Sequence, residues 1–229
     1  AASEAGDTAG AGGVVTVRND VGAIVLHNVS AVAGATGLGI AGAGGLIQLK
    51  SAGGTITQAG GTALSADNLK VVSDSNVTLQ NTGNALTTVA ASETGAGTFF
   101  KYTDTDGVTI GAVAANGTGL GTLDNLTAVT GITTDGGAVV VTSGGTGLLT
   151  IDKVILTTPS AAGTIGGAVT LTSGGAITST ATNGTITTTG SASVVDLTAN
   201  AGGQGGAVLL QSTNTGTITL NAAIAANGG

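Results

Sequence analysis

The sequence predicts an all-β protein, a single-stranded right-handed parallel β-helix (β-solenoid) with about 20 residues per rung. Three observations lead to this fold class. Short runs alternate an aliphatic residue with Thr or Ser, glycine or asparagine separates the runs, and the inward aliphatic set recurs about every eight to ten positions. Alternation with period two places successive side chains on opposite faces of a strand, and strands this short bury a core only by stacking on similar strands.

Residues 166–190, GGAVTLTSGGAITSTATNGTITTTG, carry the pattern most clearly. Val169, Leu171, Ile177 and Ile186 fall on one side of the alternation, and threonines fall on the other. The segment therefore predicts three short strands with an aliphatic inner face and a hydroxyl-coated outer face.

The pattern divides the chain into two parts. Residues 1–13 have no period and are expected to form an irregular lead-in, whereas residues 14–229 are expected to form one continuous β-solenoid, loosest around 111–131. The predicted core consists of the inward aliphatic residues of each run: Val15, Val17, Ile24, Leu26, Ile47, Leu49, Ile56, Val77, Leu79, Val108, Ile110, Val139, Val141, Leu149, Ile151, Val169, Leu171, Ile177, Ile186, Val208, Leu210, Ile218 and Leu220.

The two ends of this pattern carry no capping element. The last run, TITLNAAIAANGG, reads as one more rung, and the lead-in contains no amphipathic helix. Because bare strand edges are normally covered, we expect axial neighbours at both ends. A continuing chain is the first expectation and identical subunits are the second.

Composition excludes several classes of protein. The 229 residues include 43 Gly, no Cys, Met or Trp, and only 7% charged residues, and the regular aliphatic pattern argues against disorder. A net charge of −7 with only five Lys and Arg excludes a basic nucleic-acid interface. No apolar run approaches the roughly 20 residues of a transmembrane helix.

Several segments resemble a known family. SNVTLQNTGNALTTVAA, TDTDGVTIGAV, GITTDGGAVVVTSGG and GGAVTLTSGGAITSTATNGTI are similar to the repetitive body of filamentous-haemagglutinin-like bacterial exoproteins, which are commonly exported by two-partner secretion. The resemblance extends from about residue 12 onward and corresponds to an interior repeat region. It implies a long extracellular β-helix that serves as an adhesin, a spacer or a biofilm component.

The resemblance leads to a functional hypothesis, and the uncapped ends, the fold class and the Thr-x-Thr pairs suggest alternatives. We expect a non-enzymatic structural or adhesive rod at the bacterial cell surface, with host or microbial surface glycans or proteins as partners. The alternative is an extracellular filament built from subunits that stack end to end. Two minor alternatives are a carbohydrate-active β-helix enzyme and an ice-binding solenoid with ranked Thr-x-Thr pairs.

Few residues suggest chemistry. Asp104 and Asp106 are candidate Ca²⁺ ligands, but the D-T-D-G spacing lacks the remaining ligands, so a solvated turn is favoured. His27 is the lone histidine and has no Cys or second His as a partner. The aromatic run at 99–102 fits either a binding patch or the filling of the core. No catalytic residue and no cofactor are predicted.

Overall fold

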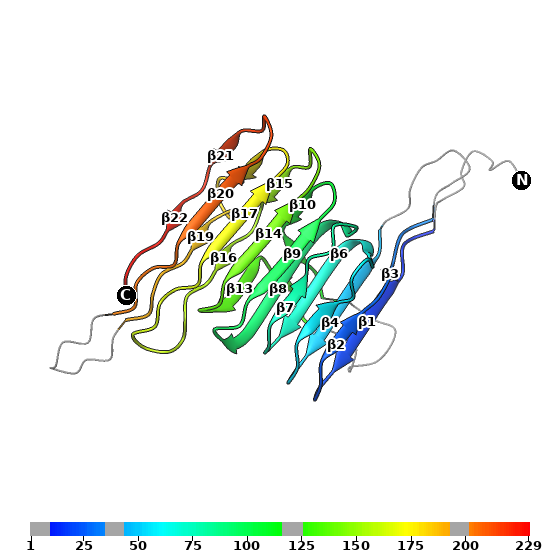
Figure 1. Cartoon of the computed structure of the whole chain (residues 1–229), viewed down its shortest axis with the longest axis horizontal. Helices are drawn as coiled ribbons and strands as arrows, with labels where there is room; N and C mark the ends of the chain where they lie inside the picture. The colour runs from blue at the N-terminus through cyan, green and yellow to red at the C-terminus, as the bar shows by residue number, and fades with distance from the viewer. Residues whose placement is uncertain (1–9, 35–43, 116–125, 193–201) are drawn as a thin grey trace, which may run out of the picture.

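The structure is a computed structural model that describes residues 10–34, 44–115, 126–192 and 202–229. It consists of mostly parallel strands, which make up 47% of the described residues, and these residues contain no helix. The chain passes back and forth between two large sheets while it advances along the long axis of the molecule, so that segments far apart in the sequence lie side by side (Figure 1).

The larger sheet has 13 strands. They are β1 (Val14–Asn19), β3 (Val29–Ser30), β4 (Leu46–Ser51), β6 (Leu64–Ser73), β8 (Ala85–Ala96), β10 (Val108–Ile110), β13 (Ile132–Asp135), β15 (Leu149–Ile151), β16 (Ile155–Leu156), β18 (Ile177–Ser179), β19 (Ile186–Thr187), β21 (Ile218–Leu220) and β22 (Ile224–Ala225). The long strand β8 pairs with β6 on one side and with both β10 and β13 on the other, so the sheet branches there.

The second sheet has seven strands in the order β2-β5-β7-β9-β14-β17-β20. Their bounds are β2 (Ile24–Leu26), β5 (Ile56–Gln58), β7 (Val77–Leu79), β9 (Phe100–Asp104), β14 (Val139–Ser143), β17 (Val169–Ser173) and β20 (Val208–Ser212). The inner faces of the two sheets share one aliphatic core, to which Phe100 and Tyr102 also belong. The aromatic run therefore contributes mainly to the core, and Phe99 packs under the Lys101 ammonium at 4.3 Å from the ring centre.

The prediction of a single-stranded right-handed parallel β-helix with about 20 residues per rung is wrong. The parallel strands form separate large sheets that do not close into a solenoid. Asn68 pairs with Thr88, 20 positions on, whereas Ile177 pairs with Ile218, 41 positions on. Alternation fixes which face of a strand is buried, but it specifies neither the length of the Gly- and Thr-rich connections nor the closure of the sheets.

Most of the predicted core lies between the sheets. Buried residues are Ile24, Leu26, Ile47, Leu49, Ile56, Val77, Leu79, Val108, Ile110, Val139, Val141, Leu149, Ile151, Val169, Leu171, Ile177 and Ile186, and half-buried ones are Val15, Val17, Val208 and Leu210. Two predicted core residues are exposed instead, Ile218 by 43% and Leu220 by 40%. They lie on β21, which has a strand partner on one side only.

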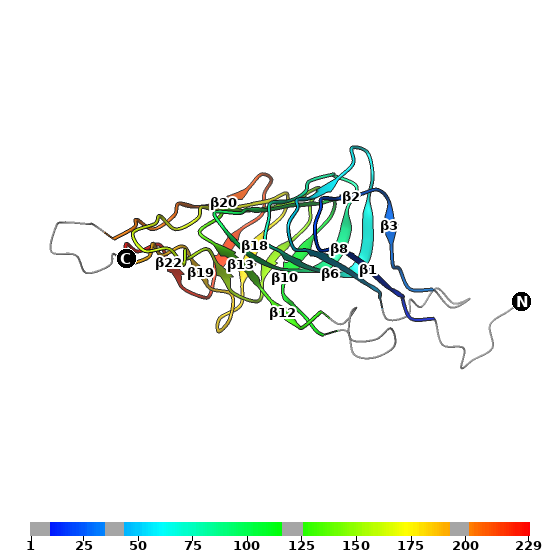
Figure 2. The ribbon, with the colours of Figure 1, turned by 90° about the horizontal axis from the view of Figure 1, so that it is seen from below.

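Residues 111–131, expected as a loose rung, leave the large sheet and form an antiparallel hairpin. The hairpin consists of β11 (Ala112–Val113) and β12 (Val129–Thr130), and residues 116–125, which lie between them in the sequence, are outside the described residues. It projects on the side of the large sheet away from the seven-stranded sheet (Figure 2). Gly131 closes it with a positive φ of 71°, where a Cβ atom would lie 2.0 Å from the Val154 carbonyl oxygen.

Lys70 attaches the hairpin to the sheet. Its side chain is fully buried, and Nζ donates hydrogen bonds to the carbonyl oxygens of Ala114 and Leu126, each at 2.9 Å. Burial lowers the pKa of Lys70, because the ammonium has lost water as a partner. A small apolar cluster of Ala90, Val113 and Val129 lies beside it.

Replacing Lys70 by methionine is expected to loosen the hairpin. The change leaves two carbonyl oxygens without their donor, so hydrogen exchange of the amides between β11 and β12 is expected to rise about tenfold. The matched control is Lys50→Met, because Lys50 is half-buried on neighbouring β4. Equal exchange rates in the two variants would show that Lys70 does not hold the hairpin.

Candidate functional site

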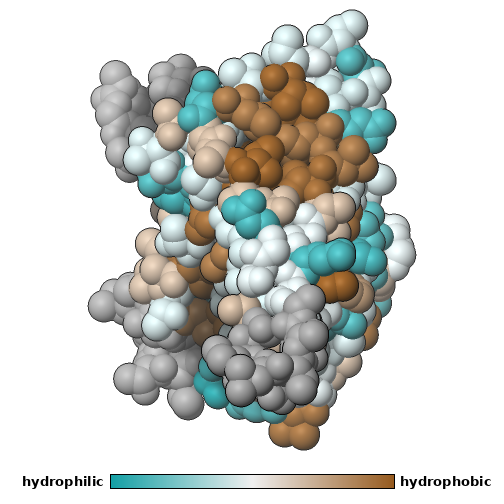
Figure 3. Space-filling model, turned by 90° about the vertical axis from the view of Figure 1, so that its left-hand side faces the viewer, coloured by the Kyte–Doolittle hydropathy of each residue, from teal (hydrophilic) through white to brown (hydrophobic). Residues whose placement is uncertain are grey.

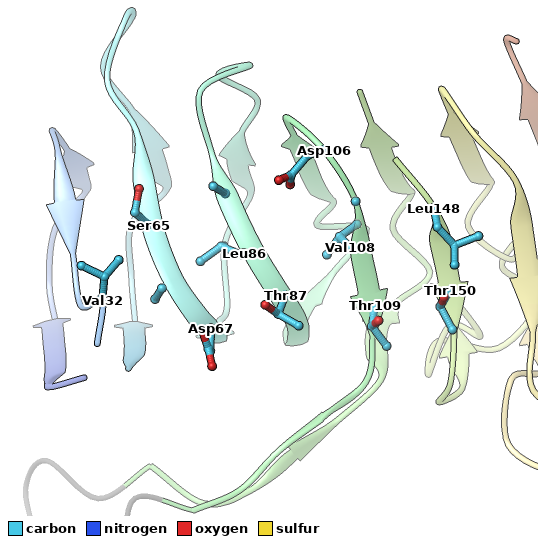
Figure 4. A pocket seen from close by; sticks show the side chains of 13 residues that line it. Val32, Ser65, Asp67, Leu86, Thr87, Asp106, Val108, Thr109, Leu148 and Thr150 are labelled. Carbon is cyan, nitrogen blue, oxygen red and sulfur yellow. The ribbon is translucent and has the colours of Figure 1, made fainter. Parts of the chain in front are cut away.

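A groove crosses the outer face of the 13-stranded sheet. It has a volume of about 710 Å³, within the range of small-ligand sites, and it extends over β6, β8, β10 and β15 (Figure 4). Six of its thirteen lining residues carry polar side chains: Ser65, Asp67, Thr87, Asp106, Thr109 and Thr150. The exposed aliphatic side chains of Val32 and Leu148 lie at its two ends.

Strand register explains why these side chains share one groove. Ser65 pairs with Ala85 between β6 and β8, and Thr109 pairs with both Thr88 of β8 and Thr150 of β15. Outward-facing residues of neighbouring parallel strands lie about 4.8 Å apart, so a hydroxyl recurs at each strand. Gly44 packs against Asp67, where a Cβ atom would lie 1.6 Å from the carboxylate carbon.

The polar side chains of the groove have no protein partner within the described residues. The hydroxyls of Thr109 and Thr150 and the carboxylates of Asp67 and Asp106 accept and donate no hydrogen bond there, and no Lys, Arg or His lines the groove. The groove therefore offers free hydroxyls and two free carboxylates to a bound molecule. Its charge is negative, in keeping with the net charge of the chain.

Asp104, a candidate Ca²⁺ ligand, is a buried structural acceptor. Its Oδ1 accepts from the backbone N–H groups of Asp106 at 3.2 Å and Gly107 at 3.0 Å, and its Oδ2 accepts from the Leu86 N–H at 3.0 Å and from the Tyr102 hydroxyl. Burial raises the pKa of Asp104, and these hydrogen bonds act in the opposite direction. The pKa of Tyr102 is raised by burial and by the neighbouring Asp104 carboxylate.

The second candidate ligand, Asp106, lies apart from this arrangement. Its carboxylate is exposed in the groove, and its backbone N–H points at Asp104. Among the described residues, no group of three or more His, Cys, Asp and Glu side chains could hold a metal ion. His27 is exposed on the turn after β2.

A row of buried polar residues closes the turns along the 13-stranded sheet. Ser51, Ser73, Thr134, Thr157 and Thr188 are at most 2% exposed, and each hydroxyl donates to a backbone carbonyl that lies before the next strand along the chain. The seven-stranded sheet has a similar row of polar residues at one register position, which consists of Asp104, Ser143, Ser173 and Ser212.

Glu93 occupies the same row between Ser73 and Thr134, but with a carboxylate in place of a hydroxyl. It is 1% exposed, and neither carboxylate oxygen has a hydrogen-bond partner within the described residues. Burial, helped by the charge of Asp74, raises the pKa of Glu93 to about 9, while the nearby Ser73 hydroxyl acts in the opposite direction. Glu93 is therefore a neutral, protonated acid at pH 7.

The sequence reasoning missed both the groove and Glu93. The signal for the buried row was present, because the recurring run ends in Ser or Thr two positions after the last inward aliphatic residue, which is again an inward position. The Thr170/Thr172 pair forms only broken ladders: Thr170 lies between Val140 and Leu209, and Thr172 lies between Thr142 and Gln211.

Comparisons with protein-family models, with curated proteins and with solved structures gave no match for this chain. The described residues include no helix that could span a lipid bilayer.

Proposed function

We propose that the chain is a non-enzymatic structural and adhesive part of a secreted or surface-displayed bacterial exoprotein of the filamentous-haemagglutinin-like type. One observation supports this most directly: the outer face of the 13-stranded sheet repeats the same hydroxyl from strand to strand. Thr88, Thr109, Thr150, Thr178 and Thr219 are in register on β8, β10, β15, β18 and β21. A surface that repeats one group in register suits contact with a ligand that is itself repetitive.

The arrangement of carboxylates favours binding over catalysis. General acid–base chemistry needs groups that converge on one bond, with pKa values matched to the reaction. The groove carboxylates come from β6 and from the turn before β10, and no His, Lys or Arg lines the groove beside them. The two carboxylates with raised pKa values, Glu93 and Asp104, are buried in the row of polar residues that follows the strands.

Attachment of coated beads tests this function. Beads that carry the full chain are expected to attach to bacterial biofilm matrix or to epithelial cells several-fold more than albumin-coated beads. Attachment at the albumin level on both surfaces would contradict an adhesive role.

A second candidate is a filament subunit, favoured by the apolar end of the two sheets. β20, β21 and β22 each have a strand partner on one side only, and Leu209, Ile218, Leu220 and Ile224 are 40% to 53% exposed there. Figure 3 shows a contiguous hydrophobic patch on this end of the molecule. Exposed apolar patches and bare strand edges are typical of contact surfaces.

Sedimentation velocity and electron microscopy test this second candidate. The chain is expected to associate with rising concentration, and the double variant Ile218→Thr/Leu220→Thr is expected to remain monomeric. Ile165→Thr is the control, because Ile165 is 58% exposed outside both sheets. A chain that stays monomeric at every concentration would exclude the filament.

A further inference from the structure

The groove over β6, β8, β10 and β15 meets its ligand through side chains. The backbone groups of these strands are used in parallel pairing with their neighbours, and the groove runs across the strands. An extended peptide that adds to a sheet needs a free strand edge that runs parallel to it. The groove offers no such edge, so a ligand that depends on main-chain pairing does not fit.

The free groups of the groove specify the chemistry of the ligand. Hydroxyls of Thr87, Thr109 and Thr150 follow one another on three neighbouring strands, and each can donate one hydrogen bond and accept others (Figure 4). Such a series complements a chain of sugar hydroxyls. No aromatic side chain lines the groove, so hydrogen bonds rather than stacking must supply the affinity.

The charges of the groove limit the class of ligand further. Asp67 and Asp106 are both free of protein partners in the described chain, and no cation lines the groove to neutralise them. Sulfated or uronic-acid glycans and nucleic acids would meet like charge there. A protonated amine, by contrast, would form a charge-assisted hydrogen bond with either carboxylate.

From these features we infer that the groove binds a glycan that carries free amino groups, such as a partly or fully N-deacetylated amino-sugar polymer. The inference rests on the proposed adhesive function and names the ligand class of its contact surface. Threonine hydroxyls position the sugar hydroxyls, and the two aspartates select the protonated amines.

Binding of defined oligomers tests the inference by isothermal titration calorimetry. The probes are fully deacetylated glucosamine hexamer, its fully N-acetylated counterpart, a heparin-derived hexamer and hexalysine. The deacetylated hexamer is expected to bind about tenfold more tightly than the acetylated one, and the heparin hexamer is expected not to bind. Hexalysine that binds as tightly as the deacetylated hexamer would overturn the inference, because the groove would then select charge alone.

Variants test separately the selection of amines by the aspartates and the binding of sugar hydroxyls by the threonines. Asp67→Asn/Asp106→Asn is expected to remove the preference for the deacetylated hexamer, and Thr109→Val/Thr150→Val is expected to weaken both glucosamine oligomers about tenfold. Thr142→Val/Thr172→Val makes the same changes on the outer face of the seven-stranded sheet and is expected to bind like the unmodified chain. Circular dichroism verifies that each variant is folded.

Bead attachment distinguishes failure of this inference from failure of the proposed function. If Asp67→Asn/Asp106→Asn beads still attach while the glucosamine oligomers do not bind the unmodified chain, the glycan inference is wrong and the adhesive function stands. If neither the beads attach nor the oligomers bind, both are wrong.

Discussion

Replacing Glu93 by glutamine is expected to remove most of the pH dependence of stability between pH 4.5 and about pH 9. In the folded chain Glu93 keeps its proton up to about pH 9, whereas in the unfolded chain the carboxyl ionises near its ordinary pKa of 4.5. The stabilisation is therefore complete below pH 4.5 and is lost progressively as pH rises toward 9. Linkage sets the greatest slope at about 1.4 kcal/mol per pH unit.

Denaturant unfolding of both proteins at a series of pH values measures this effect. Glutamine matches the protonated acid in size and polarity, so the two proteins should have similar free energies of unfolding near pH 5 and should diverge above it. The charged group that acts on Glu93 from the neighbouring turn is Asp74, which is the same in both proteins. Parallel pH profiles would show that Glu93 is ionised or solvated in the folded chain.

A threonine at position 93 tests the cause of the effect. Ser73 and Thr134, its neighbours in the row, each donate a hydroxyl to a turn carbonyl. Glu93→Thr is expected to be more stable than the unmodified chain at pH 8 and to lack its pH dependence in this window. The gain reflects removal of a buried group without hydrogen-bond partners.

The alternation of apolar and polar residues predicted the buried side chains best in the regular strands. Val169 and Leu171 fall on the apolar phase of their run, and both are fully buried in β17. Side chains alternate between the two faces of a strand, so when the residues of one face are apolar, that face is the one that is buried. Burial therefore follows from the local pattern. At β21 the pattern is the same, yet Ile218 is exposed because exposure there depends on whether a further strand covers the edge.

The architecture and the groove depended on information that the local pattern lacks. The spacing of inward residues did not reveal that the strands divide between two large sheets. Paired residues can be 20 positions apart in the sequence, as Asn68 and Thr88 are, or 41 positions apart, as Ile177 and Ile218 are. The groove combines Ser65 and Thr150, 85 positions apart, with a turn aspartate, and only the register brings them together. Glu93 occupies a position where the paired strands carry Ser73 and Thr134, and the repeat pattern does not indicate which polar residue stands there.

Replacing Asp104 by alanine is expected to lower the free energy of unfolding by about 3–5 kcal/mol. The change leaves the buried Leu86 N–H and Tyr102 hydroxyl and the partly buried N–H groups of Asp106 and Gly107 without their acceptor. Each unsatisfied buried donor costs about 1–3 kcal/mol, although small shifts of the turn and entry of water recover part of that cost. Chemical denaturation at pH 7 measures the difference.

Two further variants show whether the carboxylate acts as an acceptor or as a cation ligand. Asp104→Ser inserts the residue that β14 and β17 carry at this register, Ser143 and Ser173, and should be intermediate in stability because it supplies a single acceptor. Asp106→Ala removes the exposed carboxylate two positions on and should change stability by less than about 0.5 kcal/mol. Since both oxygens of Asp104 already accept hydrogen bonds from the protein, added Ca²⁺ should leave the unfolding midpoint of the unmodified chain unchanged. A midpoint that rises with Ca²⁺ in the unmodified chain but not in Asp104→Ala would instead make Asp104 a cation ligand.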